Sequence, residues 1–571
     1  MSTAGDGLLG RLDAVAAGLA HPDRGVRKAG ARRWSEHLWA LIYGNPLYPL
    51  TLLGPAPDRL AAQPPDPWPG TAAHGDHLFQ GRYRFAGQEV TAPKMPVWIP
   101  AGVSDAWIEE MHGFEWLRHL KASDGTTARR HARALVRDWI RHCGHWRPIA
   151  WRADVLGCRL VAWTMNARFL LTEADDAWRD AFLASLAMQA RHLTRCLSRE
   201  TEGAARIAAA RGLLYSGLCL GPSERRINAA VRLLIRECKR QILADGGHVS
   251  RSPRVQCRVL GDLADCRALL IAANRVPPDE LTRTIDRMAP MLSALRHGDG
   301  GLAAFNDSGE DDPLLVETTL KLANVKANAL ANAPHSGYQR LAAGRTAVIF
   351  DTSAPRVGSS TAHAGSLAFE MSVGEQRLVV NCGPHGGRDL DWSRALRSTA
   401  AHSTMVVADT SSSEIGPDGR IRQRPREVGC ERQQADGAVW VDARHDGYAE
   451  AFSLIHRRRL YLSADGNDLR GEDTLSPAQG APTPGPQPFA VRFHLHPKVQ
   501  ASLVMHGQAA LFKLPDGSGW QLRAIGGSLA LNPGIYFMGD GERRRSEQAV
   551  LVGVCGPEGT SIKWAIRKIS S

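Results

Sequence analysis

Apolar residues recur with a helical period through the first half of the chain, from about residue 104 to residue 335. Trp107, Met111, Phe114 and Leu117 are spaced by four, three and three residues, which is the spacing of one face of an α-helix. The same period continues in later segments such as 135–140, 182–193 and 227–242. The pattern predicts at least seven helices joined by short loops, whose apolar faces pack on one another.

The period changes to two after about residue 340. Short β-rich segments occur at 346–351, 366–371, 377–381, 403–408 and 456–463, with Asp-Gly turns between later ones. In residues 491–496, three apolar side chains alternate with Arg492, His494 and His496. This alternation predicts one apolar and one polar face, and the whole series predicts an antiparallel sandwich. The Pro- and Gly-rich segment 476–488 is expected to be a loop.

These two patterns divide the chain. We expect a multidomain α + β protein with an N-terminal extension of mixed structure at 1–100, a helical domain at 101–338 and an antiparallel β-sandwich at 339–571. In the extension, the Pro-rich residues 55–76 are expected to be extended, and a small strand pair is expected around residues 85–97. No repeat of fixed period is visible, which disfavours a repeat array.

Composition and charge narrow the class of protein. The 571 residues are 43% hydrophobic and 22% charged, as in folded globular proteins. No stretch approaches the ~20 apolar residues of a membrane span, so no transmembrane segment is expected. The net charge of +12 favours anionic partners. Because no long Lys/Arg block occurs, a nucleic-acid partner is not expected.

Cysteine usage and the N-terminus bear on the compartment. The ten cysteines include no CxxC pair, which argues against zinc fingers and thioredoxin-like chemistry. The first 25 residues lack a basic segment followed by a long apolar one, so the sequence itself favours the cytoplasm.

Candidate chemistry lies in loops and at strand ends. His248 and Arg251 lie in a loop where Ser252 is expected to cap a helix that begins at Pro253. His363 directly precedes one predicted strand, and Cys382 ends the next. A surface histidine and a core hairpin with an incidental histidine are the alternatives without chemistry.

Two later segments add candidates. Arg394 and Arg397 precede His402, and two guanidinium groups near a histidine suit a carboxylate ligand. His445 and Tyr448 follow in the segment 445–448. Solvated surface charge explains the arginines equally well.

No single segment is a motif that identifies a function by itself. The order of the segments along the chain is more informative. The segments 361–383, 398–407, 445–448 and 456–460, with GGHVSRSP at 246–253, resemble the heparinase II/III superfamily. MHGFEWLRHL at 111–120 and GEDTL at 471–475 resemble a proteobacterial branch of it. The resemblance implies an incomplete (α/α) toroid followed by an antiparallel β-sandwich. It also implies polysaccharide lyase activity, in which β-elimination cleaves uronic-acid polymers.

The resemblance also suggests roles for the candidates. Those expected to act in catalysis are His248, His363, His402 and Tyr448. Those expected to bind the anionic polysaccharide are Arg394, Arg397, Arg251 and His445. A zinc ion is a further cofactor hypothesis, with His363 and His402 as ligands and Cys382 as a substitute third ligand.

The sequence departs from the family pattern at several chemical positions. Thr361 stands where the family has its catalytic histidine, and Gly365 and Asn381 stand where it has metal-associated aspartates. Val255 falls near the expected tyrosine. These departures leave two hypotheses: a lyase with an altered active site, and an inactive family member that binds or scaffolds an anionic envelope glycan. A homodimer, and an envelope or periplasmic location by analogy, stay open.

Overall fold

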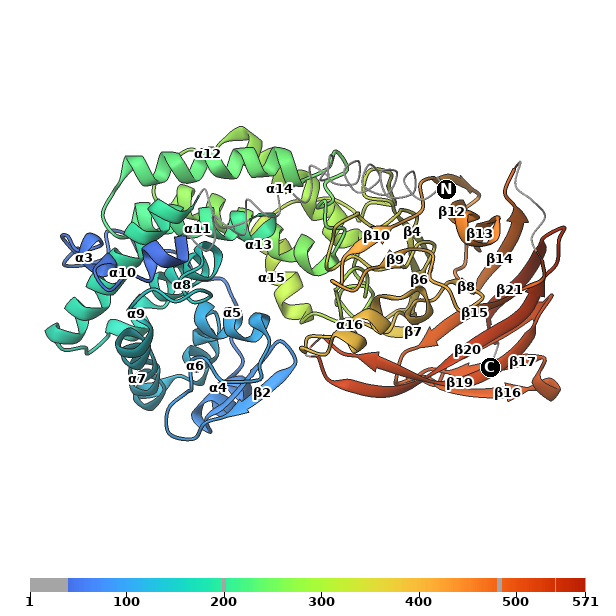
Figure 1. The fold of residues 1–571 in the computed structure, drawn as a ribbon, viewed down its shortest axis with the longest axis horizontal. Helices are drawn as coiled ribbons and strands as arrows, with labels where there is room; N and C mark the ends of the chain where they lie inside the picture. The colour runs from blue at the N-terminus through green and yellow to red at the C-terminus, as the bar shows by residue number, and fades with distance from the viewer. Residues whose placement is uncertain (1–38, 198–201, 480–484, 540, 570–571) are drawn as a thin grey trace, which may run out of the picture.

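The computed structural model describes residues 39–197, 202–479, 485–539 and 541–569. Residues 1–38 of the predicted N-terminal extension and residues 480–484 of the predicted loop lie outside the described residues. Figure 1 shows helices at one end of the molecule and sheets at the other. Within the described part, no helix is both long and apolar enough to cross a membrane.

The N-terminal region lies along the edge of the helical part. Its elements are α3 (Tyr48–Thr51), α4 (Ala72–Phe79), β1 (Arg82–Phe85) and β2 (Gln88–Thr91). The β1–β2 hairpin begins a few residues earlier than the strand pair expected around 85–97. Between α3 and α4, residues 55–71 form no helix or strand, as the Pro-rich sequence predicts. Residues 72–76, which were also expected to be extended, instead form the start of α4.

A layered set of helices follows, as the helical period predicts. They are α5 (Asp105–Gly113), α6 (Leu117–Ser123), α7 (Gly125–Cys143), α8 (Ala153–Met165), α9 (Ala167–Leu171), α10 (Asp176–Cys196), α11 (Ala204–Cys219), α12 (Glu224–Gln241), α13 (Pro253–Ala272), α14 (Asp279–Ala294) and α15 (Pro313–Ala323). Helix α11 lies at the centre and is buried along its length from Ile207 onward. A Cβ added to Gly212 would lie 2.3 Å from the Cα of Gly157, so these glycines let α8 and α11 cross closely.

Two helix boundaries show where sequence pattern succeeds and where it does not. Helix α13 begins at Pro253, and the Ser252 hydroxyl accepts a hydrogen bond from the Val255 amide at 3.5 Å, as expected of a cap. By contrast, the apolar series that starts at Trp107 crosses two helices. Phe114 ends α5 with a left-handed φ of 61°, yet its side chain is fully buried with the others.

The strands form two packed antiparallel sheets. The nine-stranded sheet contains β3 (Asn332–Ala333), β4 (Tyr338–Ala343), β5 (Thr346–Asp351), β6 (Phe369–Val373), β7 (Gln376–Val380), β8 (Met405–Val407), β15 (Gln487–Leu495), β19 (Ser528–Phe537) and β20 (Arg543–Cys555). The eight-stranded sheet contains β11 (Val428–Ala435), β12 (Ala438–Tyr448), β13 (Leu454–Leu462), β14 (Asp468–Pro477), β16 (Gln500–Val504), β17 (Ala509–Lys513), β18 (Gly519–Ile525) and β21 (Thr560–Lys568). Aliphatic and aromatic side chains of both sheets form one core, in which Phe369 stacks on Trp564.

Short elements complete the sheet half. These are α16 (Leu390–Arg397), the 3₁₀ turn η1 (Thr399–Ala401), β9 (Glu414–Ile415), β10 (Ile421–Gln423), α17 (Ala449–Phe452) and the 3₁₀ turn η2 (Met505–Gly507).

The predicted polar face of β15 is not exposed. His494 and His496 are only 3% and 7% accessible, because β15 lies inside its sheet and other segments cover its second face. His494 Nε2 bonds the carbonyl of Ala400 at 2.9 Å, and His496 Nε2 bonds Glu310 at 2.9 Å. These histidines tie the sheet to neighbouring segments.

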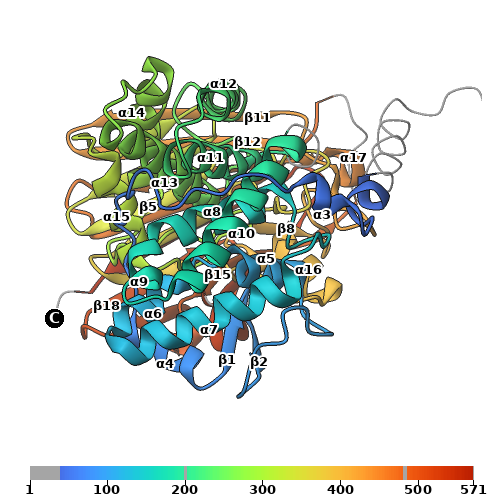
Figure 2. The ribbon, with the colours of Figure 1, turned by 90° about the vertical axis from the view of Figure 1, so that its left-hand side faces the viewer.

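The helical and sheet halves meet in tight backbone contacts. A Cβ on Gly539 would lie 1.6 Å from the Glu310 carbonyl oxygen, and one on Gly541 would lie 2.5 Å from the Cα of Gly87. Figure 2, viewed from the helical end, shows the helices in front of the sheets. The loop 303–312, between α14 and α15, lies at this junction.

Candidate active site

Two of the predicted site histidines lie side by side at the junction. His363 Nδ1 lies 3.0 Å from His402 Nε2, and the rings meet edge to face. His402 Nδ1 lies 2.7 Å from the Ser398 carbonyl oxygen, and His363 Nε2 lies 2.9 Å from the Asp307 amide nitrogen. All four ring nitrogens therefore have a partner.

These partners assign the protons on both rings. The Ser398 carbonyl can only accept, so His402 Nδ1 donates to it and His402 Nε2 carries a lone pair. His363 Nδ1 then donates to that lone pair, and His363 Nε2 accepts from the Asp307 N–H. Both imidazoles are neutral in this arrangement. Burial lowers the pKa of His402 to about 4 and that of His363 well below its usual range, which favours the neutral forms.

The histidine pair positions a loop that carries a carboxylate. Asn306 and Asp307 have left-handed φ values of 48° and 65°, and such strain in consecutive non-glycine residues persists where the surroundings enforce it. Asn306 Oδ1 accepts from the His363 amide at 3.1 Å, and Asn306 Nδ2 donates to the carbonyl of Arg251 at 3.1 Å. The loop is thus held from the helical and the sheet half together.

Asp307 is the partly exposed acid at the tip of this loop. Within the described residues, no hydrogen bond to its carboxylate is present. Burial raises the pKa of Asp307 to about 6, although Arg254 and Arg397 oppose that shift. A carboxylate with a pKa near the working pH suits a general base. Sequence reasoning missed Asp307; the available signal was the acid-rich loop 307–312.

Helix α13 presents two arginines toward the same region. Arg254 and Arg258 lie one turn apart, with side chains 40% and 48% exposed. Arg254 Nε donates to Asp311 Oδ1 at 2.7 Å. Glu110 of α5 is exposed and lies within electrostatic reach of both arginines, while desolvation raises its pKa. Arg254 and Arg258 remain accessible to an anionic ligand.

Ion pairs with carboxylates offset much of the positive charge of this region. Deeper in the helical half, Arg211 pairs with Asp262 at 2.6 Å and with Asp265 at 2.7 Å. Burial raises the pKa of Asp265 to about 6. Carboxylates therefore accompany the arginines throughout, and most of the positive charge here is compensated.

Of the predicted residues at this junction, His248 is buried and Arg251 is half-buried. His248 is 4% accessible rather than exposed in a loop. Its ring bonds Ser250 Oγ at 2.8 Å and Gln241 Oε1 at 2.9 Å, and burial lowers its pKa to about 4. Arg251 donates to the Ser336 carbonyl at 2.7 Å and pairs with Asp351. Its guanidinium also lies 5.1 Å from the Tyr338 ring centroid.

Tyr448 and His445 lie within the sandwich. The Tyr448 side chain has no exposed surface, its hydroxyl donates to the Met405 carbonyl at 2.8 Å, and burial raises its pKa. His445 Nε2 lies 3.3 Å from His456 Nδ1, and His456 Nε2 lies 2.8 Å from Asp473. Among the described residues, no hydrogen bond or ring contact joins Tyr448 or His248 to the His363–His402 pair.

Arg394 and Arg397, the two arginines that were expected to bind a carboxylate ligand, instead bind backbone carbonyls of loops. Arg397 is 5% accessible and donates to the Ala362 carbonyl at 2.8 Å and to the Gly419 carbonyl at 2.5 Å. Arg394 donates to the Pro417 carbonyl at 2.6 Å, and its side chain is 40% exposed. Of these two, Arg394 is the more accessible to a ligand.

The residues proposed for zinc do not fit a zinc site. A metal ligand must offer a lone pair, and the ring nitrogens of His363 and His402 are engaged with each other and with the backbone. Cys382 Sγ lies 3.4 Å from His494 Nδ1, and burial raises its thiol pKa to about 12. Across the described residues, no group of three or more His, Cys, Asp and Glu is arranged to hold a metal ion.

Comparison with known proteins identifies the family. The heparinase II/III N-terminus model matches residues 98–326, and the heparinase II/III-like C-terminal model matches residues 325–565. The chain is 34% identical to FtsZ-localized protein C of Caulobacter vibrioides (strain NA1000 / CB15N), over 96% of this chain and 98% of that protein. The chain belongs to the heparinase II/III family.

Solved structures of this family share the architecture. A crystal structure of heparinase III is similar with a TM-score of 0.69 and 14% identity, over 96% of this chain and 91% of that one. A mutant of heparan sulfate lyase HepC from Pedobacter heparinus has a TM-score of 0.59 and 14% identity, over 92% and 87%. This family member therefore has the helical-plus-sandwich fold of polysaccharide lyases.

Proposed function

We propose that this heparinase II/III-family protein is a polysaccharide lyase that cleaves a uronate-containing anionic polysaccharide at the junction of its two halves. The observation that carries the proposal is Asp307, a partly exposed carboxylate with a pKa near 6 that a buried histidine pair holds in place. Family membership supports the reaction class.

The proposed chemistry is a β-elimination. The Asp307 carboxylate takes the proton from C5 of the uronate, a C4–C5 double bond forms, and the C4–O4 bond breaks. The departing oxygen takes a proton from Glu110 or from water. Arg254 and Arg258 bind the uronate carboxylate, which stabilises the negative charge that develops on it when the C5 proton leaves. In this assignment, His363 and His402 are positioning residues that act through the loop.

The test uses polygalacturonate, alginate, hyaluronan and heparan sulfate as separate substrates, with ultraviolet absorbance of the unsaturated product as the readout. Asp307→Asn should lower turnover by about 10²- to 10⁴-fold, the usual contribution of a general base. Asp279→Asn is the matched control, because Asp279 is 87% exposed on α14. Equal activity of Asp307→Asn and the wild type would overturn the assignment of the base.

A second candidate function is glycan binding or scaffolding without cleavage. The observation that favours it is the burial of four predicted catalytic residues, His248, His363, His402 and Tyr448. The polar side-chain atoms of each form hydrogen bonds inside the protein. Flat absorbance with every polymer, together with measurable polymer binding, would select this function.

The relative offers a proposal about location. Its name says that it is FtsZ-localized, and we propose the same for this chain. A fluorescent fusion expressed in its own cells should coincide with labelled FtsZ. A diffuse signal would contradict the proposal.

A further inference from the structure

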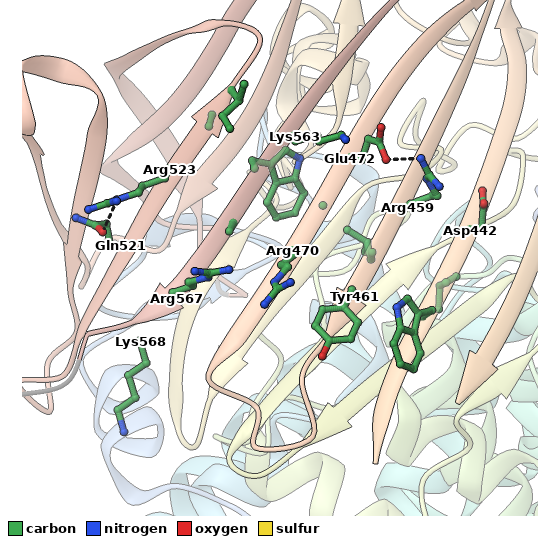
Figure 3. Close-up of a pocket in the computed structure, with 18 of the residues that line it drawn as sticks. Asp442, Arg459, Tyr461, Arg470, Glu472, Gln521, Arg523, Lys563, Arg567 and Lys568 are labelled. Atoms are coloured by element: carbon green, nitrogen blue, oxygen red, sulfur yellow. Dashed lines mark hydrogen bonds and ion pairs between the residues drawn. The ribbon is translucent and has the colours of Figure 1, made fainter. Parts of the chain in front are cut away.

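A hollow lies on the outer face of the eight-stranded sheet, and none of the junction residues described above lines it. Its volume is about 950 Å³. Residues of β11, β12, β13, β14, β18 and β21 line it, and Figure 3 shows their side chains projecting from neighbouring strands. Some lining residues, such as Val441, Leu460 and Trp564, belong to the sandwich core. Trp440, Tyr461 and Arg470 alternate with core residues along their strands and point away from the core.

The floor of the hollow is a row of cross-strand neighbours. Trp440 pairs with Tyr461, Tyr461 with Arg470, Arg470 with Ala565, and Ala565 with Arg523. The rings of Trp440 and Tyr461 lie 4.9 Å apart, and the Arg470 guanidinium lies 5.2 Å from the Tyr461 ring centroid. Trp440 and Tyr461 thus form an aromatic platform, with the small residue Ala565 further along the row. Trp440 is 41% exposed.

Cations outnumber acids around the platform. The lining cations are Arg459, Arg470, Arg523, Lys563, Arg567 and Lys568, and the lining acids are Glu431, Asp442 and Glu472. Within the described residues, Lys563 and Lys568 form no ion pair, and both are exposed. Arg470 and Arg567 share Asp468, at 2.7 Å and 3.1 Å. The hollow therefore keeps an excess of positive charge, which the junction does not.

We infer that this outer face binds an anionic oligosaccharide, with a sugar ring on the Trp440–Tyr461 platform and its acidic groups at Lys563, Arg523 and Lys568. Aromatic faces suit the C–H surface of a sugar ring, and cations suit carboxylate or sulfate groups. The choice of a glycan among anions rests on the proposed function. The site would hold a polymer at a distance from the junction.

Two features favour a glycan over a protein partner. The large exposed apolar side chains at the hollow are three, Trp440, Ile525 and Ile569, and they stand among charged side chains, whereas stable protein interfaces have an apolar core. A second copy of this chain also carries a net charge of +12, so this cationic face lacks charge complementarity with it.

The test is calorimetric titration of the full chain with four probes: a galacturonate hexamer, a heparin hexasaccharide, neutral maltohexaose and hexaglutamate. Trp440→Ala and Lys563→Ala should each weaken binding of an acidic hexasaccharide about tenfold or more, and Trp440→Phe should retain most of it. Arg232→Ala, an exposed arginine on α12, is the control that should bind as the wild type does. Tighter binding of galacturonate assigns carboxylates, and tighter binding of heparin assigns sulfates.

Three results would overturn the inference: unchanged binding in Trp440→Ala, equal binding of maltohexaose, or tighter binding of hexaglutamate. The outcome is separable from that of the lyase proposal. Loss of binding in Trp440→Ala in a protein without turnover would support the outer site and reject the lyase. If turnover depends on Asp307 and Trp440→Ala binds the oligosaccharide as the wild type does, the lyase proposal is supported and the outer site is rejected.

Discussion

Gly365 leaves the space that the His402 ring occupies. A Cβ at this position would lie 2.8 Å from His402 Cδ2 and 3.2 Å from Nε2. The resemblance to the family aligns an aspartate here. A side chain at 365 is therefore incompatible with the observed position of the His402 ring.

Gly365→Ala should displace His402 and break its bond to His363. We expect a loss of about 1 to 3 kcal/mol in the free energy of unfolding, which is typical of overpacking, and a fall in any Asp307-dependent activity. Urea denaturation measures the first effect. Gly429→Ala is the control, because its added Cβ would meet Arg444 at an ordinary 3.5 Å; equal stability of both variants would contradict the tight contact.

Asp307 should set the acid limb of the pH–rate profile near pH 6, because only its ionised form accepts a proton. A base at His402, whose pKa burial lowers to about 4, would place that limb lower. The measurement is kcat/KM from pH 4.5 to 8. An acid limb near pH 4 would instead assign the base to a histidine.

The same residue should carry a cost in stability. The raised pKa means that the folded state holds the proton more tightly than the unfolded chain, so ionised Asp307 destabilises the fold above about pH 6 and not below about pH 4. Asp307→Asn should therefore be more stable at pH 8 by roughly 1 to 2 kcal/mol, allowing for solvent screening, and not at pH 4. Thermal unfolding at both values measures this; a loss of stability at pH 8 would contradict it.

At the scale of the elements, alternation located several strands, although it wrongly predicted an exposed polar face for β15. Strand β5 has the bounds 346–351 that its sequence predicts, and β13 alternates inward and outward as expected. Inward-facing Arg458 was not expected to be buried. It pairs with Asp473 through Nε at 2.7 Å inside the core, and the Trp564 indole donates to the same carboxylate at 2.8 Å. The Trp564–Asp473 bond joins residues 91 positions apart in the sequence, and a local pattern does not contain such a contact.

Arg458→Ala should cost about 3 to 5 kcal/mol, because it leaves the Asp473 carboxylate buried without its cation. Arg457→Ala on the same strand should cost under about 1 kcal/mol, because Arg457 is 47% exposed and pairs with Asp442 at the surface. Chemical denaturation of both variants measures the difference. Similar values would show that the buried pair is not a stabilising unit.

The site was less predictable than the elements for the same reason. The sequence indicated His363 and His402 as members of one site, and the structure brings them together. It did not indicate that a hydrogen bond joins the two rings, or that the Asp307 amide is the next member of this series of hydrogen bonds. Those facts depend on three loops that meet only after folding.

At the scale of the whole molecule, many histidines are buried in neutral form. Burial lowers the pKa of His112, His192 and His494 to about 3 and that of His248 and His402 to about 4. A histidine whose pKa is depressed in the folded state stabilises the fold above its unfolded pKa of about 6.5 and loses that contribution as pH falls. Several such groups act together.

We therefore expect the midpoint of thermal unfolding to fall steeply between about pH 6 and pH 4.5, with uptake of several protons on unfolding. Calorimetry across this range gives both quantities. A midpoint that stays constant down to pH 4.5 would contradict neutral burial of these rings.

Homodimer formation remains a separate prediction, which sedimentation at neutral pH tests.

The glycine contacts between the halves have a mechanical consequence. With Gly539 against the Glu310 carbonyl and Gly541 against Gly87, backbone meets backbone at these two points, and neither glycine leaves room for a side chain. We expect such close backbone contacts to oppose opening and closing of the two halves around a long polymer. The polymer must instead slide in along an existing surface, so X-ray scattering should give the same radius of gyration for the protein with and without a bound oligosaccharide.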